Sequence, residues 1–164
     1  ALIGEFRYRI LGKRRVNLSE LIRLVSVNLV LGELGRSAME NIVEGSTLHA
    51  IKPGRILVRQ HDAADATYVI LHGEGKVFLS EDENETSIAE VGRGDVVGEM
   101  GVILNQPRMA TIRATTRMQV VRIDRNVLLE ALDEVPNVGA HIRKLIEDRI
   151  ARNQARLGGK LSGQ

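Results

Sequence analysis

The fold of this chain is set by residues 98–111, which read Gly98-Glu99-Met100-Gly101-Val102-Ile103-Leu104-Asn105-Gln106-Pro107-Arg108-Met109-Ala110-Thr111. A glycine turn leads here into a short helical segment over residues 99–104. A helix start preceded by glycine offers free backbone N–H groups and the positive end of the helix dipole to an anion. Arg108 follows on the return limb, where its planar and permanently charged guanidinium can reach the same anion. Glu99 suits sugar hydroxyls rather than a phosphate.

Short runs rich in β-branched residues lie on both sides of this segment and predict strands. They cover residues 46–51, 55–59, 67–72, 76–80, 86–91, 110–114 and 118–123. Clusters of Gly, Pro, Asn and Asp separate these runs and predict turns. Short strands at roughly even spacing, with no long helix between them, predict an antiparallel roll, sandwich or barrel.

Helical patterns precede the strands. Apolar residues recur at helical spacing from Leu18 to Leu29, and Asn17 with Glu20 resembles a capping box. A second box, starting at Ser37, precedes a second short helix that ends near residue 45. The pattern therefore predicts two helices in the first third of the chain.

Helices are also expected after the strands. Asp124 is a plausible N-cap for a helix over residues 125–134, which ends before Pro136 because the residue before proline avoids the α region. An amphipathic helix then extends to about Leu157, with one apolar stripe made of Val138, Ile142, Leu145, Ile146 and Ile150. This stripe is expected to cover either the rest of the domain or a second copy of the helix.

Composition places the chain among ordinary globular domains. Of its 164 residues, 43% are hydrophobic and 27% are charged, and cysteine is absent, which excludes a disulfide framework and a thiolate nucleophile. The net charge is +2, with basic ends around an acidic middle, and only four aromatic residues are present, which argues against a base-stacking platform for single strands. No secretory signal or spanning segment is visible, and a start at Ala1 instead of Met is typical of a piece of a longer chain.

Residues 98–112 resemble the phosphate-binding cassette of the cyclic nucleotide-binding domain family, which includes the catabolite activator protein, protein kinase A regulatory subunits and cyclic-nucleotide-gated channels. The match comprises Gly98, Glu99, Met100, Gly101, Val102, Pro107, Arg108, Ala110, Thr111 and Ile112. The turns at residues 62–65 and 92–95 and the run Tyr68-Val69-Ile70 also match. The resemblance spans about residues 34–152 and agrees in order and spacing.

The resemblance implies an α+β fold, an eight-stranded antiparallel β-roll (jelly-roll-like) with N-terminal helices, a short cassette helix and two C-terminal helices. It implies that Arg108 binds the cyclic phosphate, that Glu99 binds the ribose 2′-hydroxyl, and that backbone N–H groups near Gly101 and Ala110 complete the cradle. The ligand-binding residues expected on this basis are Gly98, Glu99, Met100, Gly101, Arg108, Met109, Ala110 and Thr111.

Three residues depart from the family pattern. His61 stands where glycine is usual, and Gly75 stands where an apolar strand residue is usual. Met109 lacks the hydroxyl with which cyclic-GMP binders often contact guanine, which favours cyclic AMP, although Thr111 is nearby and cyclic GMP stays an alternative. The ligand expected is cyclic AMP, with no metal or other cofactor.

Two rival classes are disfavoured and a third stays open. A cupin-type metal enzyme needs closely spaced histidines, whereas His49, His61, His72 and His141 are at least eleven residues apart. A transcription factor of the catabolite activator type needs a helix-turn-helix after the last helix, and only seven residues follow Leu157, so no nucleic-acid partner is expected on these residues. A degenerate domain that serves only as a protein-interaction module is the open alternative.

The sequence thus predicts a non-enzymatic, cytoplasmic regulatory domain that couples cyclic nucleotide binding to movement of its C-terminal helix, with a homodimer through that helix as a further expectation. Its expected parts are an N-terminal helical segment over residues 1–45, the nucleotide-binding roll with the first C-terminal helix over 46–135, and a C-terminal lid or dimer helix with its tail over 136–164.

Overall fold

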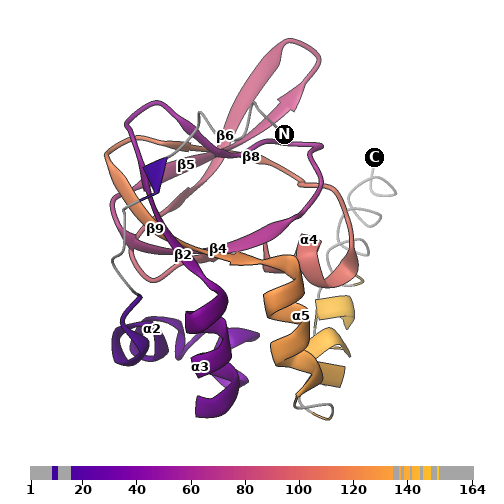
Figure 1. Ribbon diagram of the computed structural model, residues 1–164. Coiled ribbons are helices and arrows are strands. Elements are labelled where there is room, and N and C mark those ends of the chain that lie inside the picture. Colours follow the sequence, from indigo (N-terminus) through magenta and orange to yellow (C-terminus); the bar gives the residue numbers. More distant parts are fainter. Residues whose placement is uncertain are drawn as a thin grey trace.

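The computed structural model describes residues 9–10, 16–134, 137, 139–140, 142–144, 146–148 and 151. Its strands are β1 (Arg9–Ile10), β2 (Thr47–Ile51), β3 (Ile56–Val58), β4 (Ala66–His72), β5 (Gly75–Glu81), β6 (Asn84–Val91), β7 (Val96–Val97), β8 (Thr111–Ala114) and β9 (Met118–Asp124). Its helices are α2 (Leu18–Val25), the 3₁₀ helix η1 (Leu31–Glu33), α3 (Arg36–Gly45), α4 (Glu99–Leu104) and α5 (Arg125–Asp133). In Figure 1, α2, α3 and α5 lie beneath the strands and α4 lies at one end of them.

The strands form two antiparallel sheets that face each other as a roll. One sheet has the order β1-β2-β9-β4-β7 and the other has the order β3-β8-β5-β6. Strand β2 pairs along its whole length with β9, from Thr47 opposite Arg122 to Ile51 opposite Met118. The eight strands β2–β9 confirm the predicted roll, and the two-residue strand β1 adds to its edge beside β2.

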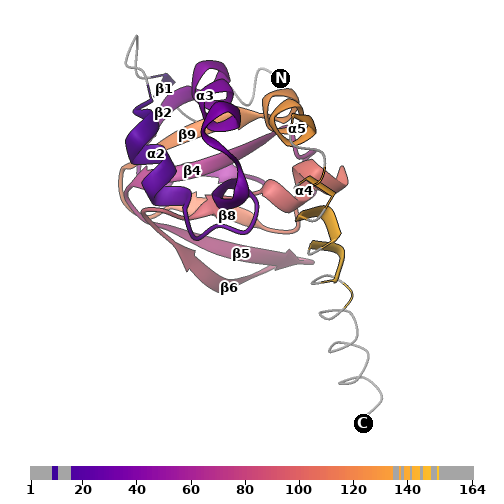
Figure 2. The same cartoon turned by 90° about the horizontal axis from the view of Figure 1, so that it is seen from below.

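Successive side chains of a strand point to opposite faces of its sheet, and this alternation creates two apolar cores. On β4, Ala66, Tyr68 and Ile70 point into the roll, while Val69 and Leu71 point toward the helices. Side chains of β9 divide in the same way, because successive residues of a strand face opposite sides of the sheet. The sheet with β4 and β9 is therefore buried on both faces, and Figure 2, seen from the helical side, shows α2 and α3 in front of it.

The N-terminal helices differ from the prediction in their ends. The side chain of Asn17 accepts a hydrogen bond from the backbone N–H of Glu20 at 3.0 Å, so the first cap is confirmed. Helix α2 ends at Val25, however, and Leu29 is 52% exposed beyond it. The second capping box was wrong: α3 begins at Arg36 after the N-cap Gly35, and Ser37 lies inside the first turn.

An Asx-type contact explains why the first helix is shorter than its apolar spacing predicts. The side-chain oxygen of Asn28 accepts hydrogen bonds from the backbone N–H groups of Val30 and Leu31, both at 2.9 Å. These bonds start η1 in place of a continued α-helix, because Asn side chains compete for backbone groups near turns.

The first C-terminal helix agrees with the prediction within one residue. Asp124 occupies the N-cap position of α5, yet its side chain makes no capping hydrogen bond and instead accepts one from Arg122 at 2.9 Å. The described residues between 137 and 151 are all helical, and Ile142 and Ile146 are buried in the same core as α2, α3 and α5. Val138, Leu145, Ile150 and Leu157 of the predicted stripe and its end lie outside the described residues.

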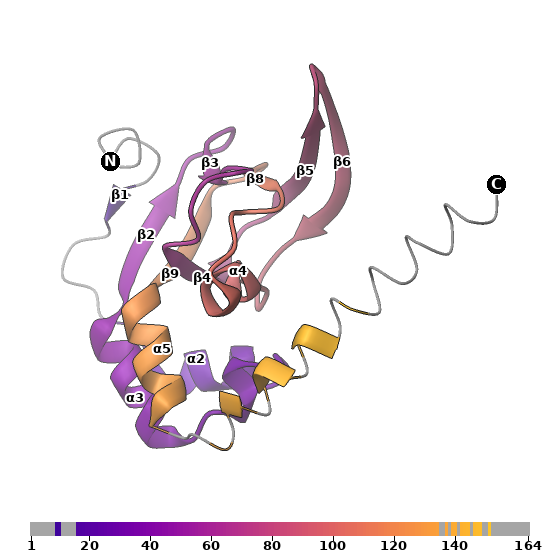
Figure 3. The ribbon, with the colours of Figure 1, turned by 90° about the vertical axis from the view of Figure 1, so that its right-hand side faces the viewer.

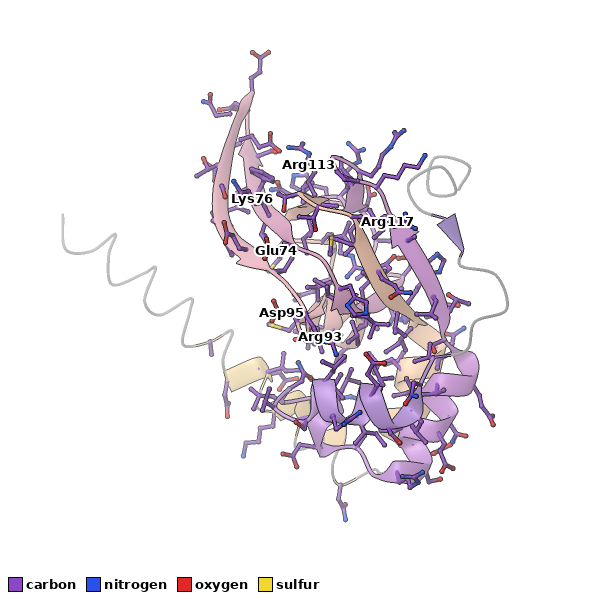
Figure 4. All side chains as sticks on the ribbon, turned by 90° about the vertical axis from the view of Figure 1, so that its left-hand side faces the viewer. Glu74, Lys76, Arg93, Asp95, Arg113 and Arg117 are labelled. Atoms are coloured by element: carbon purple, nitrogen blue, oxygen red, sulfur yellow. The ribbon has the colours of Figure 1, made fainter. Side chains whose placement is uncertain are left out.

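The hairpin of β5 and β6 projects away from the roll, as Figure 3 shows. Strand β6 is exposed from Asn84 to Glu90 and forms an edge of its sheet. At the opposite end of β6, Arg93 donates to the backbone oxygen of Leu71 and to the Glu20 carboxylate at 3.3 Å, which ties the roll to α2. Figure 4 shows Arg93 and Asp95 where the roll meets the helices, and Lys76 and Arg113 farther up the roll.

Candidate functional site

The segment between β7 and β8 folds as the sequence predicts, with a glycine turn, a short helix and a return limb. Gly98 has a φ of 84° and precedes α4, and Asn105 ends that helix with a φ of 52°. A Cβ atom at Gly98 would lie 2.0 Å from Nη1 of Arg108, so a side chain there would force the guanidinium to move. The glycine is therefore required both for its backbone conformation and for the close approach of the arginine.

Arg108 is buried beneath this turn, with 6% of its surface exposed. Its Nη1 donates to the backbone oxygen of Gly98 at 3.1 Å, and its Nη2 donates to the backbone oxygen of Ala66. The carboxylate of Asp65 lies 3.7 Å from Nη2. Desolvation by burial lowers the pKa of Arg108 from its ordinary value, while Tyr68 and Asp65 oppose that shift. The guanidinium stays charged, since arginine is not deprotonated in proteins, and the negative charges of Asp65 and Asp62 both favour its charged form.

The backbone of Arg108 is fixed by the turn that follows β3. Its N–H donates to the oxygen of Asp62 at 2.8 Å, and its own oxygen accepts from the N–H of His61 at 2.9 Å. His61 has a φ of 75°, so it adopts the left-handed conformation that the expected glycine would adopt freely. For a residue with a Cβ this costs about 1 kcal/mol. The departure at His61 thus leaves the turn and its two hydrogen bonds in place.

A pocket of about 180 Å³ opens beside Arg108, and most of the side chains around it are apolar. Its lining consists of Val58, Gly98, Met100, Gly101, Gln106, Pro107, Arg108, Met109, Ala110 and Ile112. Six of the eight predicted site residues are in this lining: Gly98, Met100, Gly101, Arg108, Met109 and Ala110. An apolar hollow with one buried cation at its wall suits a ligand that combines a flat apolar part with an anionic group.

Two predicted site residues are placed differently. Thr111 is buried at the start of β8, and its hydroxyl accepts a hydrogen bond from the backbone N–H of Gln60 at 3.0 Å, so it joins β8 to the end of β3. Glu99 is the first residue of α4 and does not line the pocket in this structure. Met109 is 78% exposed at the rim.

A charged cluster next to Arg108 was not predicted from the sequence. Arg122 on β9 donates to the hydroxyl of Tyr68 at 2.8 Å and to Asp124 at 2.9 Å, and its Nη2 lies 3.4 Å from Asp65. The side chain of Arg122 is 20% exposed. The signal that could have revealed it is its position, since Met118, Val120 and Arg122 alternate along the strand and an inward-facing charge needs partners.

His49 lies beside this cluster on β2 and is 5% exposed. Its Nε2 and the hydroxyl of Thr47 are 2.7 Å apart. Burial and the charge of Arg122 lower the pKa of His49 from 6.5 to about 4, against an opposite effect of Asp124. His49 is therefore neutral at physiological pH and acts as part of the packing.

The described part of the chain contains neither a group of metal-ligating side chains nor a helix suited to span a membrane. Among these residues, no three or more His, Asp or Glu side chains are grouped so as to hold a metal ion. None of their helices is both long enough and apolar enough to cross a membrane.

Known proteins with similar sequences contain this segment as a small part of their length. The chain is 28% identical over 115 residues to patatin-like phospholipase domain-containing protein 6 of Mus musculus, covering 70% of this chain and 8% of that protein. It is 29% identical over 101 residues to the lysophospholipase nte1 of Aspergillus fumigatus, covering 61% of this chain and 7% of that protein.

Solved structures share the fold. A cyclic nucleotide-binding-like protein from Brucella abortus superposes with a TM-score of 0.62 at 27% identity, covering 68% of this chain and 97% of that one. The regulatory domain of Toxoplasma gondii PKA, crystallised with cAMP, superposes with a TM-score of 0.66 at 21% identity, covering 70% of this chain and 44% of that one. At 21% identity, the similarity to the Toxoplasma gondii structure shows a shared fold only.

The sequence profile of the family described as "Cyclic nucleotide-binding domain" matches residues 48–135, from β2 through the cassette to the end of α5. The match includes the glycine turn, the buried arginine and the strands that hold them. Because it covers more than half of the 164 residues, the chain belongs to the cyclic nucleotide-binding domain family.

Proposed function

We propose that this domain binds cyclic AMP in the pocket beside Arg108 and passes the binding event to its C-terminal helices. The observation that carries the proposal is the burial of Arg108, a cation, at the wall of an apolar pocket, with the carboxylate of Asp65 3.7 Å from its Nη2. A buried cation is costly unless it is paired, and the side chain of Asp65 is itself 66% exposed. A cyclic phosphate in the pocket would supply a further negative charge through a bidentate contact.

The rest of the ligand is matched to the remaining lining. Val58, Met100 and Ile112 offer apolar contact to the flat base, and Met109 at the rim has no hydroxyl for guanine, which favours cyclic AMP over cyclic GMP. Glu99, at the start of α4, is the residue proposed for the ribose 2′-hydroxyl, with backbone N–H groups near Gly101 and Ala110 for the phosphate.

Regulation is proposed to act through the helices that follow the roll. The nucleotide favours a state in which these helices are docked, and the free energy transmitted cannot exceed the difference in binding free energy between the docked and displaced states. The much greater length of the matching phospholipases supports a role as one regulatory part of a larger protein. A homodimer through the last helix, a cytoplasmic location, and the division at residues 45 and 135 stay predictions.

Calorimetry with cyclic AMP tests the binding. We expect Arg108→Ala to abolish measurable binding, because a desolvated phosphate would lose its side-chain counter-charge, worth about 2–5 kcal/mol. Arg117→Ala is the matched control, since Arg117 is an exposed arginine in the turn before β9 and does not line the pocket. Unchanged affinity in Arg108→Ala would contradict the site.

The alternative, an interaction module without a ligand, is distinguished by the melting temperature. A binder gains about 2.7 kcal/mol of stability at a ligand concentration one hundred times its dissociation constant, whereas a module that does not bind gains nothing. Wild type that melts at the same temperature with and without millimolar cyclic AMP would favour the interaction module.

A further inference from the structure

Asp65 is shared between two arginines. One carboxylate oxygen lies 3.7 Å from Nη2 of Arg108, and the other lies 3.4 Å from Nη2 of Arg122. Arg122 lies outside the cassette, on β9, is 57 positions from Asp65 in the sequence, and does not line the pocket. Arg122 reaches Asp65 because the roll pairs β9 with β4, which places Arg122 opposite Tyr68 on the neighbouring strand.

Contacts on several sides hold Arg122 in place. Its Nη1 donates to the Tyr68 hydroxyl at 2.8 Å, its Nε donates to Asp124 at 2.9 Å, and its guanidinium carbon lies 5.7 Å from the centre of the Tyr68 ring. Because the guanidinium is a rigid planar fork, these contacts fix the direction in which Nη2 points. Asp65, by contrast, is largely exposed in the turn before β4.

The charge balance at the pocket follows from this geometry. With Arg122 present, the Asp65 carboxylate is shared between two guanidinium groups, and Arg122 is also paired with Asp124. Without Arg122, Asp65 would have Arg108 as its remaining partner in the pair, and its carboxylate would compete with an incoming phosphate for the same N–H groups.

We propose that Arg122 is a positioning residue of the phosphate site, which acts by holding the Asp65 carboxylate so that it only partly neutralises Arg108. This inference rests on the proposed nucleotide binding and adds a determinant of its affinity outside the cassette.

The same cluster reaches the start of α5. The backbone oxygen of Asp65 accepts a hydrogen bond from the N–H of Arg125, the first residue of α5, at 2.9 Å. Asp124, the N-cap residue, accepts from Arg122 in place of capping the helix. Arg122 thus holds both sides of the junction between the phosphate site and the first C-terminal helix.

A double-mutant cycle with Arg122→Gln and Asp65→Asn tests the proposal, with cyclic AMP affinity measured by calorimetry. We expect Arg122→Gln to lower the affinity about tenfold and Asp65→Asn to leave it equal or higher. In the Asp65→Asn background, Arg122→Gln should change the affinity less than twofold, because the residue acts through Asp65. Equal losses in both backgrounds, or no loss in either, would overturn the proposal.

Arg113→Gln is the matched control for removing an arginine that stacks on an aromatic ring and pairs with a carboxylate. Arg113 lies 5.0 Å from the centre of the Phe78 ring and 3.0 Å from Glu85, on the other sheet. It should bind cyclic AMP like wild type. If Arg122→Gln does not fold, Arg122→Lys keeps the charge without the fork and should show a smaller loss with the same dependence on Asp65.

A ligand-free measurement separates this inference from the proposed function. The NMR signal of the Arg108 Nε–H group should shift on Arg122→Gln and should not shift on the same change in the Asp65→Asn background. Wild type that fails to bind cyclic AMP would overturn the proposed function, while this signal would still decide the positioning role. If the chemical shift of the Arg108 Nε–H group is unchanged by Arg122→Gln, the positioning role is overturned, whether or not the wild type binds cyclic AMP.

Discussion

At the scale of single residues, Arg108 and Glu99 have opposite charges and sit at opposite ends of the cassette. The guanidinium of Arg108 donates hydrogen bonds to two backbone oxygens, those of Gly98 and Ala66. Its donors are therefore preorganised, which reduces the entropy lost on binding. Glu99 at the start of α4 is positioned by a six-residue helix. The two residues should contribute unequally to affinity.

Glu99→Gln should weaken cyclic AMP binding less than Arg108→Ala, because a neutral amide oxygen still accepts a hydrogen bond from the ribose. Hydrogen bonds to charged groups contribute about 1.5–3 kcal/mol, against about 1 kcal/mol for neutral ones. A 2′-deoxy analogue, compared with cyclic AMP by calorimetry, should lose affinity for wild type and much less for Glu99→Gln. Equal losses in the two proteins would remove Glu99 from the ribose.

His49 makes the stability of the domain depend on pH. Its pKa is about 4 in the folded state against 6.5 ordinarily, so the unfolded chain binds the proton more readily. The contribution of His49 is full above pH 6.5 and is lost as the pH falls toward 4, by a total on the order of 3 kcal/mol. Urea unfolding of wild type and His49→Gln across this range measures it. The variant should lack this part of the slope, and parallel curves would contradict the assignment.

At the scale of elements, the turn between β7 and α4 contains Gly98, whose backbone conformation and lack of a side chain leave room for the guanidinium of Arg108. Gly98→Ala should lower the free energy of unfolding by about 1–3 kcal/mol because of its positive φ. It should also reduce cyclic AMP affinity more than tenfold, because the new Cβ would lie 2.0 Å from Nη1 of Arg108. Urea unfolding and calorimetry measure the two effects.

Gly54→Ala is the control for this substitution, since Gly54 has a φ of 83° and no atom within 4 Å of a Cβ placed there. It should show the strain without the loss of affinity. If both variants bind equally, the close approach at Gly98 does not set the position of Arg108.

Most strands could be located from the sequence to within two residues, because β-branched runs and turn residues record the alternation of a half-buried sheet. Strand β7 was missed, since Val96 and Val97 are too few to show a period. Helix ends were less predictable. Apolar spacing alone extended the first helix to Leu29, whereas the side chain of Asn28 ends that pattern by binding two backbone N–H groups.

Part of the candidate site could be predicted from the sequence, and part of it could not. The glycine turn, the short helix and the arginine are local in sequence, so their geometry could be predicted. The link between Asp65 and Arg122 joins residues that are 57 positions apart. It depends on the register of β4 against β9, and no local pattern reports a register between distant strands.

At the scale of the whole molecule, the helices before and after the roll share one core. Leu21 of α2, Ile42 of α3 and Leu128 of α5 are all fully buried there, together with Ile142. A ligand that shifts α5 must therefore act on the N-terminal helices as well, since closely packed cores transmit strain.

Cyclic AMP should slow amide hydrogen exchange in the described helical residues 139–140, 142–144 and 146–148, beyond the direct contacts at residues 99–111. This follows if the nucleotide favours the docked state of that helix, because exchange reports local opening. Mass spectrometry of wild type with and without cyclic AMP measures it, and Arg108→Ala is the control. If the protein binds cyclic AMP but the exchange rates of these residues do not change, the helix does not respond to the ligand and the domain is a passive nucleotide-binding module.

The pairing of β2 with β9 also has a consequence for how the chain folds. Thr47 must find Arg122, and Arg108 must find the carbonyl of Ala66, across long separations, so folding should be slow, on the order of milliseconds to seconds. The phosphate site does not exist until this closure is complete. A nucleotide therefore cannot speed the search of the open chain. If it binds the folded site as proposed, it should lengthen the lifetime of the closed roll while the rate of refolding stays unchanged.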